Sequence, residues 1–414
     1  MSIDTEKDAV KLAKTAIIAF GLISLFGDII YEGARGSIPA YLEVLATPAV
    51  IVGLAIGLGE FLGYALRLAS GYVADTTKAY WTLTIIGYGL IISIPLLALT
   101  YDWRFAVVLI IAERIGKAIR TPARDTLISV TTKGIGRGKA FGLHELFDQI
   151  GATVGPLLMA IILYKTAEQG KTPIEQFHTA FLFLFIPYMI LIIVLLSGYL
   201  KMKSPAAEAL QTAEIEKPKE ELSRPFYLYS IAVMMNTAGL FHIALILYIS
   251  TGLMPESLWL IPILYLLVQG IDAASAPISG AAYDKHGIKV LSIPFILSIL
   301  PTIFIASIYT NIVPLTPTIL IIASVITFGI ILGMQESIYR AAVADLTGIT
   351  KRGTGYGIFN TAYGLGFLIS GTIIGYIIDK ATTTPSYMLI AVIYTIVLQA
   401  TALILLKTAT KAKQ

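Results

Sequence analysis

The sequence predicts an all-α polytopic membrane protein with about twelve transmembrane helices in two six-helix bundles, arranged as a parallel pseudo-repeat. Of its 414 residues, 56% are hydrophobic and only 14% are charged, which is too apolar for a soluble domain of this length. About twelve apolar runs approach the roughly 20 residues that cross a bilayer. A short Gly-x-x-x-Asp turn also occurs in each half, as Gly71 to Asp75 and as Gly280 to Asp284.

The apolar runs fall into two sets of six. The first set covers residues 15–40, 48–72, 79–100, 105–126, 138–164 and 177–200, and the second covers 225–250, 256–283, 288–309, 315–344, 354–379 and 384–407. Lysines and acids alternate through residues 201–224, which predicts a cytoplasmic linker between the sets. The expected domains are therefore an N-terminal bundle within residues 1–200 and a C-terminal bundle within 225–414.

Basic residues in the short loops give the orientation, because cytoplasmic loops are enriched in lysine and arginine. When both termini are placed inside, few basic residues remain outside, namely Arg104, Lys165, Lys171 and Lys380. We therefore expect a multi-pass protein of the cell membrane with cytoplasmic termini. The first residues are expected to form a retained tail, since the apolar run that follows is too long for a signal peptide.

Several classes of function are disfavoured by composition. With 0 Cys the chain has no disulfide framework, no thiolate nucleophile and no cysteine metal cage. A net charge of +4, spread through the loops, argues against a nucleic-acid partner. A zinc-protease helix needs His-Glu-x-x-His, but Asp148 stands where the second histidine would be, and a phosphate-binding loop ending at Thr172 would need Gly at Lys165. We expect no enzyme and no cofactor, and an ion gradient as the energy source.

The duplication extends beyond the Gly-x-x-x-Asp turns. Arg120 to Asp125 ends the fourth span as Arg340 to Asp345 ends the tenth, and the copies follow one another in the same order. Both halves therefore enter the membrane in the same orientation. The residues expected to form a cytoplasmic gate are Gly71, Asp75, Arg120, Arg124, Asp125, Gly280, Asp284, Arg340 and Asp345, with Arg120, Arg124 and Asp125 meeting the Asp75 loop.

Charged residues inside the expected spans are the candidate site, because each costs about 2.5 to 3.5 kcal/mol on insertion scales and tends to be functional. Asp28, Glu32 and Arg35 share one face of the first span. Their excess of acid can take up a proton or attract a cation, with a self-neutralising structural cluster as the alternative. Glu32, between the other two, is the first choice for the coupling acid.

The fourth span is the most basic. Glu113, Lys117, Arg120 and Arg124 line one face, and Arg114 lies about 100° round from Glu113. Arg114 and Lys117 are the deeper cations. They are expected either to balance Glu32, Glu60 or Asp148 or to bind an anionic substrate, and the sequence leaves both possibilities open.

The other charged candidates are more scattered. His144 and Asp148 share a face of the fifth span, and His144 is expected to be a proton site or a buried, hydrogen-bonded histidine. Glu60 and Arg67 of the second span are expected to pair with neighbouring helices, and Asp272 of the eighth is either a functional or a hydrogen-bonded interior acid. The full set expected for proton coupling and substrate is Asp28, Glu32, Arg35, Glu60, Arg67, Glu113, Arg114, Lys117, His144, Asp148 and Asp272.

These residues resemble the major facilitator superfamily. Gly71 to Lys78 and Gly280 to Gly287 are similar to its loop signature Gly-x-x-x-Asp-Arg/Lys-x-Gly, and Arg114 stands where its fourth-helix arginine is expected. Gly151, Gly155 and Pro156 resemble the fifth-helix Gly-x-x-x-Gly-Pro of its proton-coupled exporters, and Pro156 favours a helix bend there. The resemblance implies two bundles around a central cavity, and alternating access with proton-coupled export of a small solute by antiport.

Alternatives within transport are ion-coupled uptake and movement of a divalent cation held by Asp28, Glu32, His144 and Asp148. From another class, the chain could be a membrane sensor or a lipid-handling protein on a transporter fold. The expected partners are a small-molecule substrate, protons or another coupling ion, and the lipid bilayer, with the protein acting as a monomer.

Overall fold

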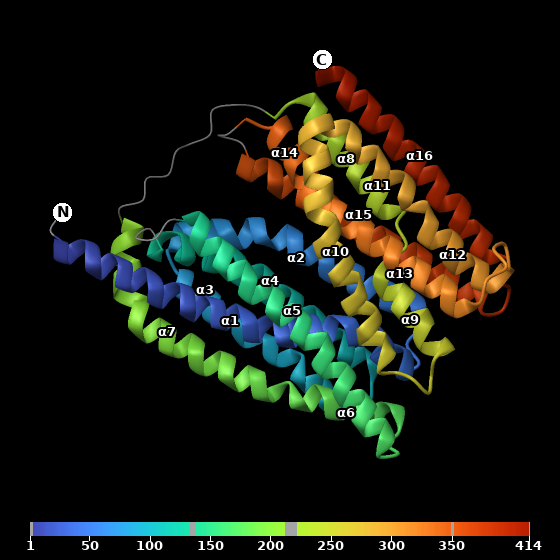
Figure 1. Cartoon of the computed structure of the whole chain (residues 1–414), viewed down its shortest axis with the longest axis horizontal. Coiled ribbons are helices and arrows are strands. Elements are labelled where there is room, and N and C mark those ends of the chain that lie inside the picture. Colours follow the sequence, from blue (N-terminus) through green and yellow to red (C-terminus); the bar gives the residue numbers. More distant parts are fainter. Residues whose placement is uncertain (1–2, 133–136, 212–221, 349–351, 414) are drawn as a thin grey trace. The chain divides into compact units, whose positions relative to one another are not determined.

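The structure is a computed structural model that describes residues 3–132, 137–211, 222–348 and 352–413. All regular structure in these ranges is helical, which confirms the predicted all-α class (Figure 1). Lys133, Lys351 and residues 212–221 of the predicted linker lie outside the described residues.

The helices of the first half follow the expected spans. They are α1 (Ile3–Val44), α2 (Ala49–Thr77), α3 (Tyr80–Gly89), α4 (Trp103–Thr131), α5 (Arg137–Glu168), α6 (Pro173–Phe183) and α7 (Phe185–Gln211). The third expected span is less regular than its apolar run suggests, because two 3₁₀ turns, Leu90–Ser93 and Pro95–Leu99, follow α3. Pro95 lacks the backbone donor that would extend an α-helix.

The second half shows three interruptions that hydropathy does not reveal. Its helices are α8 (Arg224–Ala238), α9 (Ile243–Leu253), α10 (Leu260–His286), α11 (Ser292–Leu297), α12 (Ile299–Thr310), α13 (Pro317–Met334), α14 (Arg340–Leu346), α15 (Arg352–Ala381) and α16 (Tyr387–Lys413). The seventh expected span is split into α8 and α9, and the ninth into α11 and α12. A π-helical turn, Gln335–Tyr339, separates α13 from α14.

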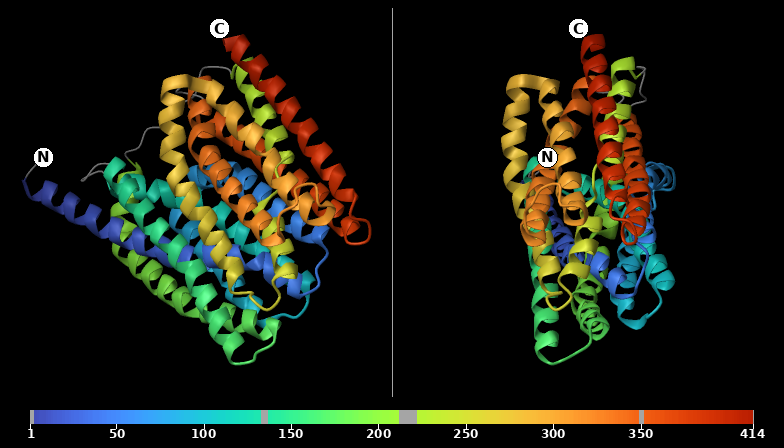
Figure 2. Two further views of the ribbon diagram at one scale, coloured as in Figure 1. Left: turned by 45° about the vertical axis from the view of Figure 1, so that its right-hand side comes forward. Right: turned by 90° about the vertical axis from the view of Figure 1, so that its right-hand side faces the viewer.

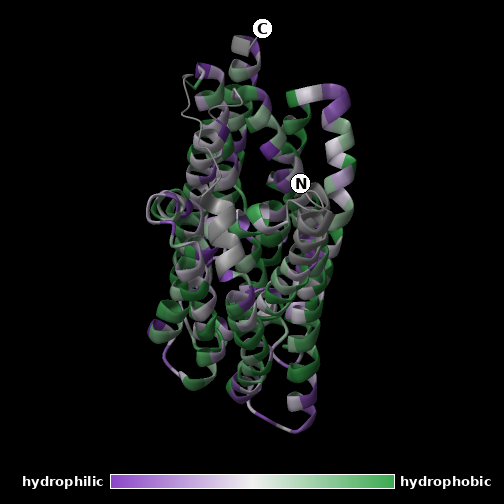
Figure 3. Ribbon diagram, turned by 90° about the vertical axis from the view of Figure 1, so that its left-hand side faces the viewer, coloured by the Kyte–Doolittle hydropathy of each residue, from purple (hydrophilic) through white to green (hydrophobic). Residues whose placement is uncertain are grey.

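Ten segments of the described chain are long and apolar enough to cross a membrane. One of them, Leu260–Thr310, is 51 residues long and contains α10, α11 and α12, which is enough for two spans. Helix α4 is not among the ten segments, because its charged residues lower its hydropathy. If Leu260–Thr310 is counted as two spans and α4 as one more, the total is about twelve, as expected. Figure 3 shows apolar residues along most of the helices and polar residues concentrated in the connecting loops.

The packing of Cα atoms divides the chain into two compact units. Unit 1 contains Met1–Ser37 and Leu66–Ile215, and unit 2 contains Ile38–Ala65 and Glu216–Gln414. Helices α1 and α2 therefore contribute to both units. The predicted bundle boundaries at residues 200 and 225 stay predictions, whereas the segment Ile38–Ala65 is found with the C-terminal helices (Figure 2).

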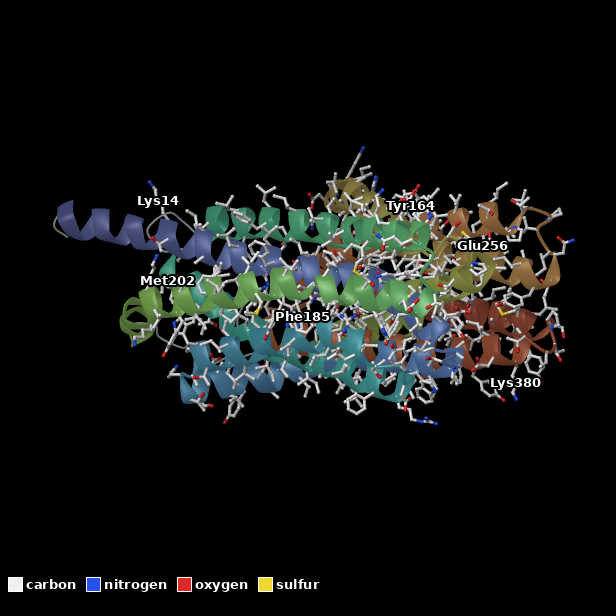
Figure 4. All side chains as sticks on the ribbon, turned by 90° about the horizontal axis from the view of Figure 1, so that it is seen from below. Lys14, Tyr164, Phe185, Met202, Glu256 and Lys380 are labelled. Carbon is white, nitrogen blue, oxygen red and sulfur yellow. The ribbon has the colours of Figure 1, made fainter. Side chains whose placement is uncertain are left out.

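In unit 1, the beginning of α1 and the far part of α7 lie toward the same end, as the labels of Lys14 and Met202 show in Figure 4. Helix α3 packs on α4, and α5 on α6. In unit 2, α8 packs on α15 and α16, and α10 packs on α13.

Glycines hold the α2 part of unit 2 against α15. A Cβ atom on Gly53 would overlap the backbone of Gly371, and one on Gly57 would lie 2.7 Å from the carbonyl oxygen of Phe367. Such contacts need residues without side chains, as is common between membrane helices. Gly53 and Gly57 therefore allow this part of α2 to pack closely on α15.

Candidate functional site

The candidate site in unit 1 is built where α5 crosses α1. A Cβ atom on Gly151 would lie 2.6 Å from the carbonyl oxygen of Leu25 and 2.9 Å from the Cβ atom of Asp28. One on Gly155 would lie 2.5 Å from the carbonyl oxygen of Ile29. The glycines thus let the two backbones meet beside the acids of α1. Pro156 lies inside α5, which continues through it to Glu168.

Two carboxylates from these helices interact next to a lysine of α4. Asp28 is within electrostatic reach of Asp148, Lys117 and Arg124. Asp148 is within reach of Arg124 and Lys117 as well. The hydroxyl group of Ser24 on α1 also hydrogen-bonds to Asp148. Asp28, Lys117 and Asp148 are all partly exposed, so the group is not sealed in a dry core.

His144 lies one turn before Asp148 on α5. It is 5% exposed, and its Nε2 is 3.7 Å from the Oδ2 of Asp148, which is longer than a hydrogen bond. Neither ring nitrogen has a hydrogen-bond partner among the described residues. The expected alternative of a histidine hydrogen-bonded to a neighbouring helix is therefore not found. The His144 ring has one nitrogen that can donate and one that can accept a hydrogen bond, next to the carboxylate of Asp148.

Three cations surround the ring of Tyr31 on α1. The Nζ of Lys117 lies 3.7 Å from the ring centroid, and the Cζ atoms of Arg114 and Arg35 lie 4.8 Å and 5.8 Å from it. The Arg114 guanidinium also donates a hydrogen bond to the Tyr31 hydroxyl. Glu32 is close to Arg35, with 3.8 Å between Oε1 and Nη1. We call Arg35, Arg114 and Lys117 the Tyr31 cluster.

A second charged group on α4 faces α3. The Oε1 of Glu113 lies 3.2 Å from the Nη2 of Arg120, and its Oε2 lies 3.9 Å from the Nε of Arg114. Arg120 also donates to the carbonyl oxygen of Gly87 and lies over the ring of Tyr88. Glu113 is 2% exposed and Arg120 is 4% exposed, so this is a buried pair that ties α4 to α3.

The expected face of α4 needs one correction. Lys117 does not follow Glu113, Arg120 and Arg124 toward α3 but reaches Tyr31 with Arg114. On a helical wheel Lys117 lies about 40° from Glu113, toward Arg114. Its long, flexible stem can therefore swing to the tyrosine.

The residues predicted to form a cytoplasmic gate make other contacts than the predicted one with Asp75. Asp75 accepts a hydrogen bond from the Tyr80 hydroxyl at 2.9 Å, and Arg124 pairs with Asp125 at 2.8 Å. Within the described ranges, neither Arg124 nor Arg120 pairs with Asp75. Each arginine instead pairs with an acid on its own helix, Arg120 with Glu113 and Arg124 with Asp125.

The second-half gate residues are placed in a comparable way. The Tyr283 hydroxyl donates to Asp345 at 3.0 Å, which joins α10 to α14, while Asp284 is exposed. The backbone oxygen of Arg340 accepts from Tyr356 at 3.1 Å. The two loop glycines face equivalent neighbours, since a Cβ atom on Gly71 would be 3.6 Å from Pro122 and one on Gly280 would be 3.2 Å from Ser337.

The remaining expected residues are not gathered at this site. Glu60 and Asp272 belong to unit 2, where the carbonyl oxygen of Glu60 lies against Gly364, and that of Asp272 lies against Gly333. Arg67 belongs to unit 1 and is partly exposed. Among the described residues, no group of three or more His, Asp or Glu side chains is arranged to hold a metal ion. The four side chains named for the divalent-cation alternative are thus not assembled into one ligand set.

Two features of the sites were missed from the sequence. Tyr31 stands between Asp28 and Glu32, but with 22 tyrosines in the chain its type alone carried no signal. In unit 2 a buried polar hub forms around Asn236, whose Nδ2 donates to Gln399 at 2.7 Å and whose Oδ1 accepts from Tyr339 at 2.7 Å. Its side chain also donates to Ser298, at the break between α11 and α12.

Comparison with known sequences agrees with this architecture. The sequence profile of the Major Facilitator Superfamily matches residues 18–348 and 273–414. A protein of Mycobacterium tuberculosis is 33% identical over 384 residues, which cover 91% of this chain and 89% of that protein. An MFS-type transporter of Methanocaldococcus jannaschii is 28% identical over 369 residues, covering 87% of this chain and 88% of that one.

Solved structures share the fold at low sequence identity. A POT family transporter in complex with 5-aminolevulinic acid has a TM-score of 0.72 at 14% identity, covering 96% of both chains. The nucleoside transporter NupG has a TM-score of 0.69 at 14% identity, covering 94% of this chain and 98% of that one. With the profile matched along most of its length, the chain belongs to the Major Facilitator Superfamily and has the fold of its transporters.

Proposed function

We propose that this protein is a secondary active transporter of a small solute that works by alternating access. We propose that protons drive the transport and bind at Asp28 and Asp148. The observation that carries the proposal is that Asp28 and Asp148 interact where Gly151 lets α5 pack closely on α1, with Lys117 and Arg124 of α4 nearby. Two interacting acids beside an ammonium and a guanidinium group are a suitable place for a proton to bind and leave.

Partial exposure of these charges supports an aqueous route to them. The side chains of Arg35 and Asp148 are 28% and 22% exposed, and Asp28 and Arg35 lie well inside the membrane-spanning stretch Ala13–Val44. A charged group facing lipid at such a depth is costly, so partly exposed charges face water or polar groups instead. Water gives protons and solute access to the site.

Protonation would act through the electrostatic attraction of Lys117 and Arg124 to the two acids. When Asp28 or Asp148 takes up a proton, one negative charge beside the ammonium group disappears. The electrostatic attraction between α4 and the α1–α5 pair then weakens. A change in the relative stability of two packings is what alternating access requires of its coupling ion.

The geometry favours Asp28 over Glu32, which the sequence favoured, as the coupling acid. Glu32 has the guanidinium group of Arg35 3.8 Å away and is 8% exposed. Asp28 instead interacts with a second carboxylate across a helix contact. Like charges held close together make one proton easier to bind.

Export is the direction that the resemblance of Gly151, Gly155 and Pro156 to exporters favours. In this chain the two glycines pack α5 on α1, a role that serves transport in either direction. The relatives named above include a nucleoside transporter and a transporter bound to 5-aminolevulinic acid, which supports a small organic solute. We also propose the cell membrane as the location and a monomer as the functional unit.

The test uses purified protein in liposomes that contain a pH-sensitive dye. A panel of nucleosides, short peptides and carboxylic acids is added outside, and proton movement and solute counterflow are recorded. The wild-type protein should move protons with at least one solute. Asp28→Asn should abolish proton movement and retain counterflow, because solute exchange between two loaded states needs no net proton transfer.

Glu168→Gln, at the exposed end of α5, is the matched control and should behave as the wild type. Proton-driven flux that persists in both Asp28→Asn and Asp148→Asn would refute the coupling site. If no solute of the panel moves with a gradient, the proposal fails in favour of a membrane sensor or lipid-handling protein.

A further inference from the structure

The positive charge of the Tyr31 cluster favours an anionic substrate. Lys117 lies 3.7 Å from the centroid of the Tyr31 ring. Asp28 and Asp148 attract it electrostatically, but no direct ion pair joins it to a carboxylate of the described residues. An ammonium group inside a membrane helix needs a strong partner, and a cation–π contact supplies only part of what an ion pair would. The cluster therefore holds a cation with capacity for a further anion.

The tyrosine itself contributes a donor. Its hydroxyl oxygen accepts from Arg114, and its own proton has no acceptor among the described residues. Tyr31 is 3% exposed, so this donor is kept from bulk water. A phenol proton next to an ammonium group and two guanidinium groups matches a carboxylate or a phosphate, which arginine recognises through paired hydrogen bonds.

The net charge of the side chains around the Tyr31 cluster connects binding of an anion with binding of a proton. Arg35, Arg114, Lys117, Arg120 and Arg124 bring five positive charges, and Glu32, Glu113, Asp28, Asp148 and Asp125 bring five negative ones. His144, which lies 3.7 Å from Asp148, is counted as neutral. With all acids ionised the group is neutral. A proton on Asp28 or Asp148 makes it positive by one charge, which an incoming anion restores to neutrality.

We propose that the substrate is an organic anion bearing a carboxylate or phosphate, and that it binds at the Tyr31 cluster together with the proton. This rests on the proposed proton coupling and goes beyond it by giving substrate class and direction. Because proton and anion bind best together, they cross together, and an inward proton gradient drives uptake. Uptake is the direction opposite to the one that the exporter resemblance favours.

The test measures binding to the purified protein as a rise in Tm. The soluble probes are benzoate and glycerol 3-phosphate, and micelles of phosphatidylglycerol test a lipid headgroup as the source of the phosphate. Benzamide and choline are the neutral and cationic controls. At least one soluble anion should raise Tm, and neither control should.

The variants connect the effect to the cluster. Lys117→Gln should weaken the apparent affinity for that anion about tenfold or more, because a charged hydrogen bond is lost. Lys117→Arg should retain most of it. Lys165→Gln, which removes a lysine that is 65% exposed and paired with Glu168, is the matched control and should change nothing. The affinity of the wild-type protein should rise as the pH falls, and this pH dependence should disappear in Asp28→Asn.

The inference is overturned if neither soluble anion raises Tm, if only phosphatidylglycerol does, if choline does, or if Lys117→Gln keeps full affinity. Its failure is separable from that of the proposed function. Anion binding without proton-driven flux would refute the coupling alone. Proton-driven flux of an uncharged or cationic solute would refute the anion site and leave the coupling intact.

Discussion

Glu113 is the residue on which the charge arrangement of α4 depends. Its two oxygens lie 3.2 Å from Arg120 and 3.9 Å from Arg114, and all three side chains are buried. Without Glu113, two guanidinium groups would be left beside one another in a medium that stabilises charge poorly. The acid therefore holds Arg120 toward α3 and keeps Arg114 within reach of Tyr31.

We expect Glu113→Gln to lower the free energy of unfolding by about 3–5 kcal/mol, the range for breaking a buried ion pair. The measurement is an SDS titration in mixed micelles followed by circular dichroism. Glu168→Gln, which breaks the exposed pair with Lys165, should leave the midpoint unchanged. If the double variant Glu113→Gln/Arg120→Gln loses as much stability as the two single losses added together, the pairing of these two residues is refuted.

At the residue scale, the sequence predicts which charged side chains are energetically unfavourable inside the membrane but not in which direction they point. Asp28, Lys117 and Asp148 could be named because charge inside an apolar run is visible in one dimension. Tyr31 could not, since its role depends on α4 lying across α1. The side of α4 on which Lys117 lies was likewise decided by the neighbouring ring and not by the helical wheel.

At the scale of elements, the start of α2 is capped by a residue 330 positions away in the chain. The carboxylate of Asp379, near the end of α15, accepts from the backbone nitrogens of Ala49 at 2.7 Å and Val50 at 3.0 Å. Tyr248 of α9 adds a hydrogen bond to the carbonyl oxygen of Thr47 at 2.9 Å. A negative charge at a helix N-terminus satisfies free N–H groups and the helix dipole.

We expect Asp379→Ala to release this end of α2, at a cost of about 0.5–2 kcal/mol for the lost cap. Hydrogen–deuterium exchange should become faster at Ala49 and Val50. Asp102→Ala removes the N-cap of α4, where the Asp102 carboxylate accepts from the backbone nitrogen of Arg104 at 2.8 Å, and should accelerate exchange there only. Unchanged exchange at Ala49 and Val50 in Asp379→Ala would contradict the cap.

Hydropathy predicts helices well and their interruptions poorly. An apolar run of sufficient length is a local property, so the spans could be located without knowing the fold. The break between α8 and α9 depends instead on His242, whose Nδ1 accepts from the backbone nitrogen of Ala244 at 3.1 Å and starts a new helix. The π-helical turn at Gln335–Tyr339 lies at the hub of Asn236, a contact between helices far apart in sequence.

At the scale of the molecule, the predicted membrane topology depends on lysines at or just beyond the ends of helices. Lys78 follows α2, and Lys285 lies in the last turn of α10. Lys171 precedes α6, and Lys380 lies in the last turn of α15. From the bias of basic residues we expect the first two in the cytoplasm and the last two outside. In unit 2, the end of α15 and the start of α2 meet through Asp379, so both are expected on the outer side.

The absence of cysteine makes this topology directly testable, because a single introduced thiol is the sole target for a maleimide. In intact cells, a membrane-impermeant maleimide should label Lys171→Cys and Lys380→Cys. It should label Lys78→Cys and Lys285→Cys only after the membrane is permeabilised. Since Lys78, Lys285 and Lys380 are exposed and Lys171 is partly exposed, the substitutions should leave folding intact. Labelling of Lys285→Cys in intact cells would place this end of α10 outside the cell and refute the predicted orientation of unit 2.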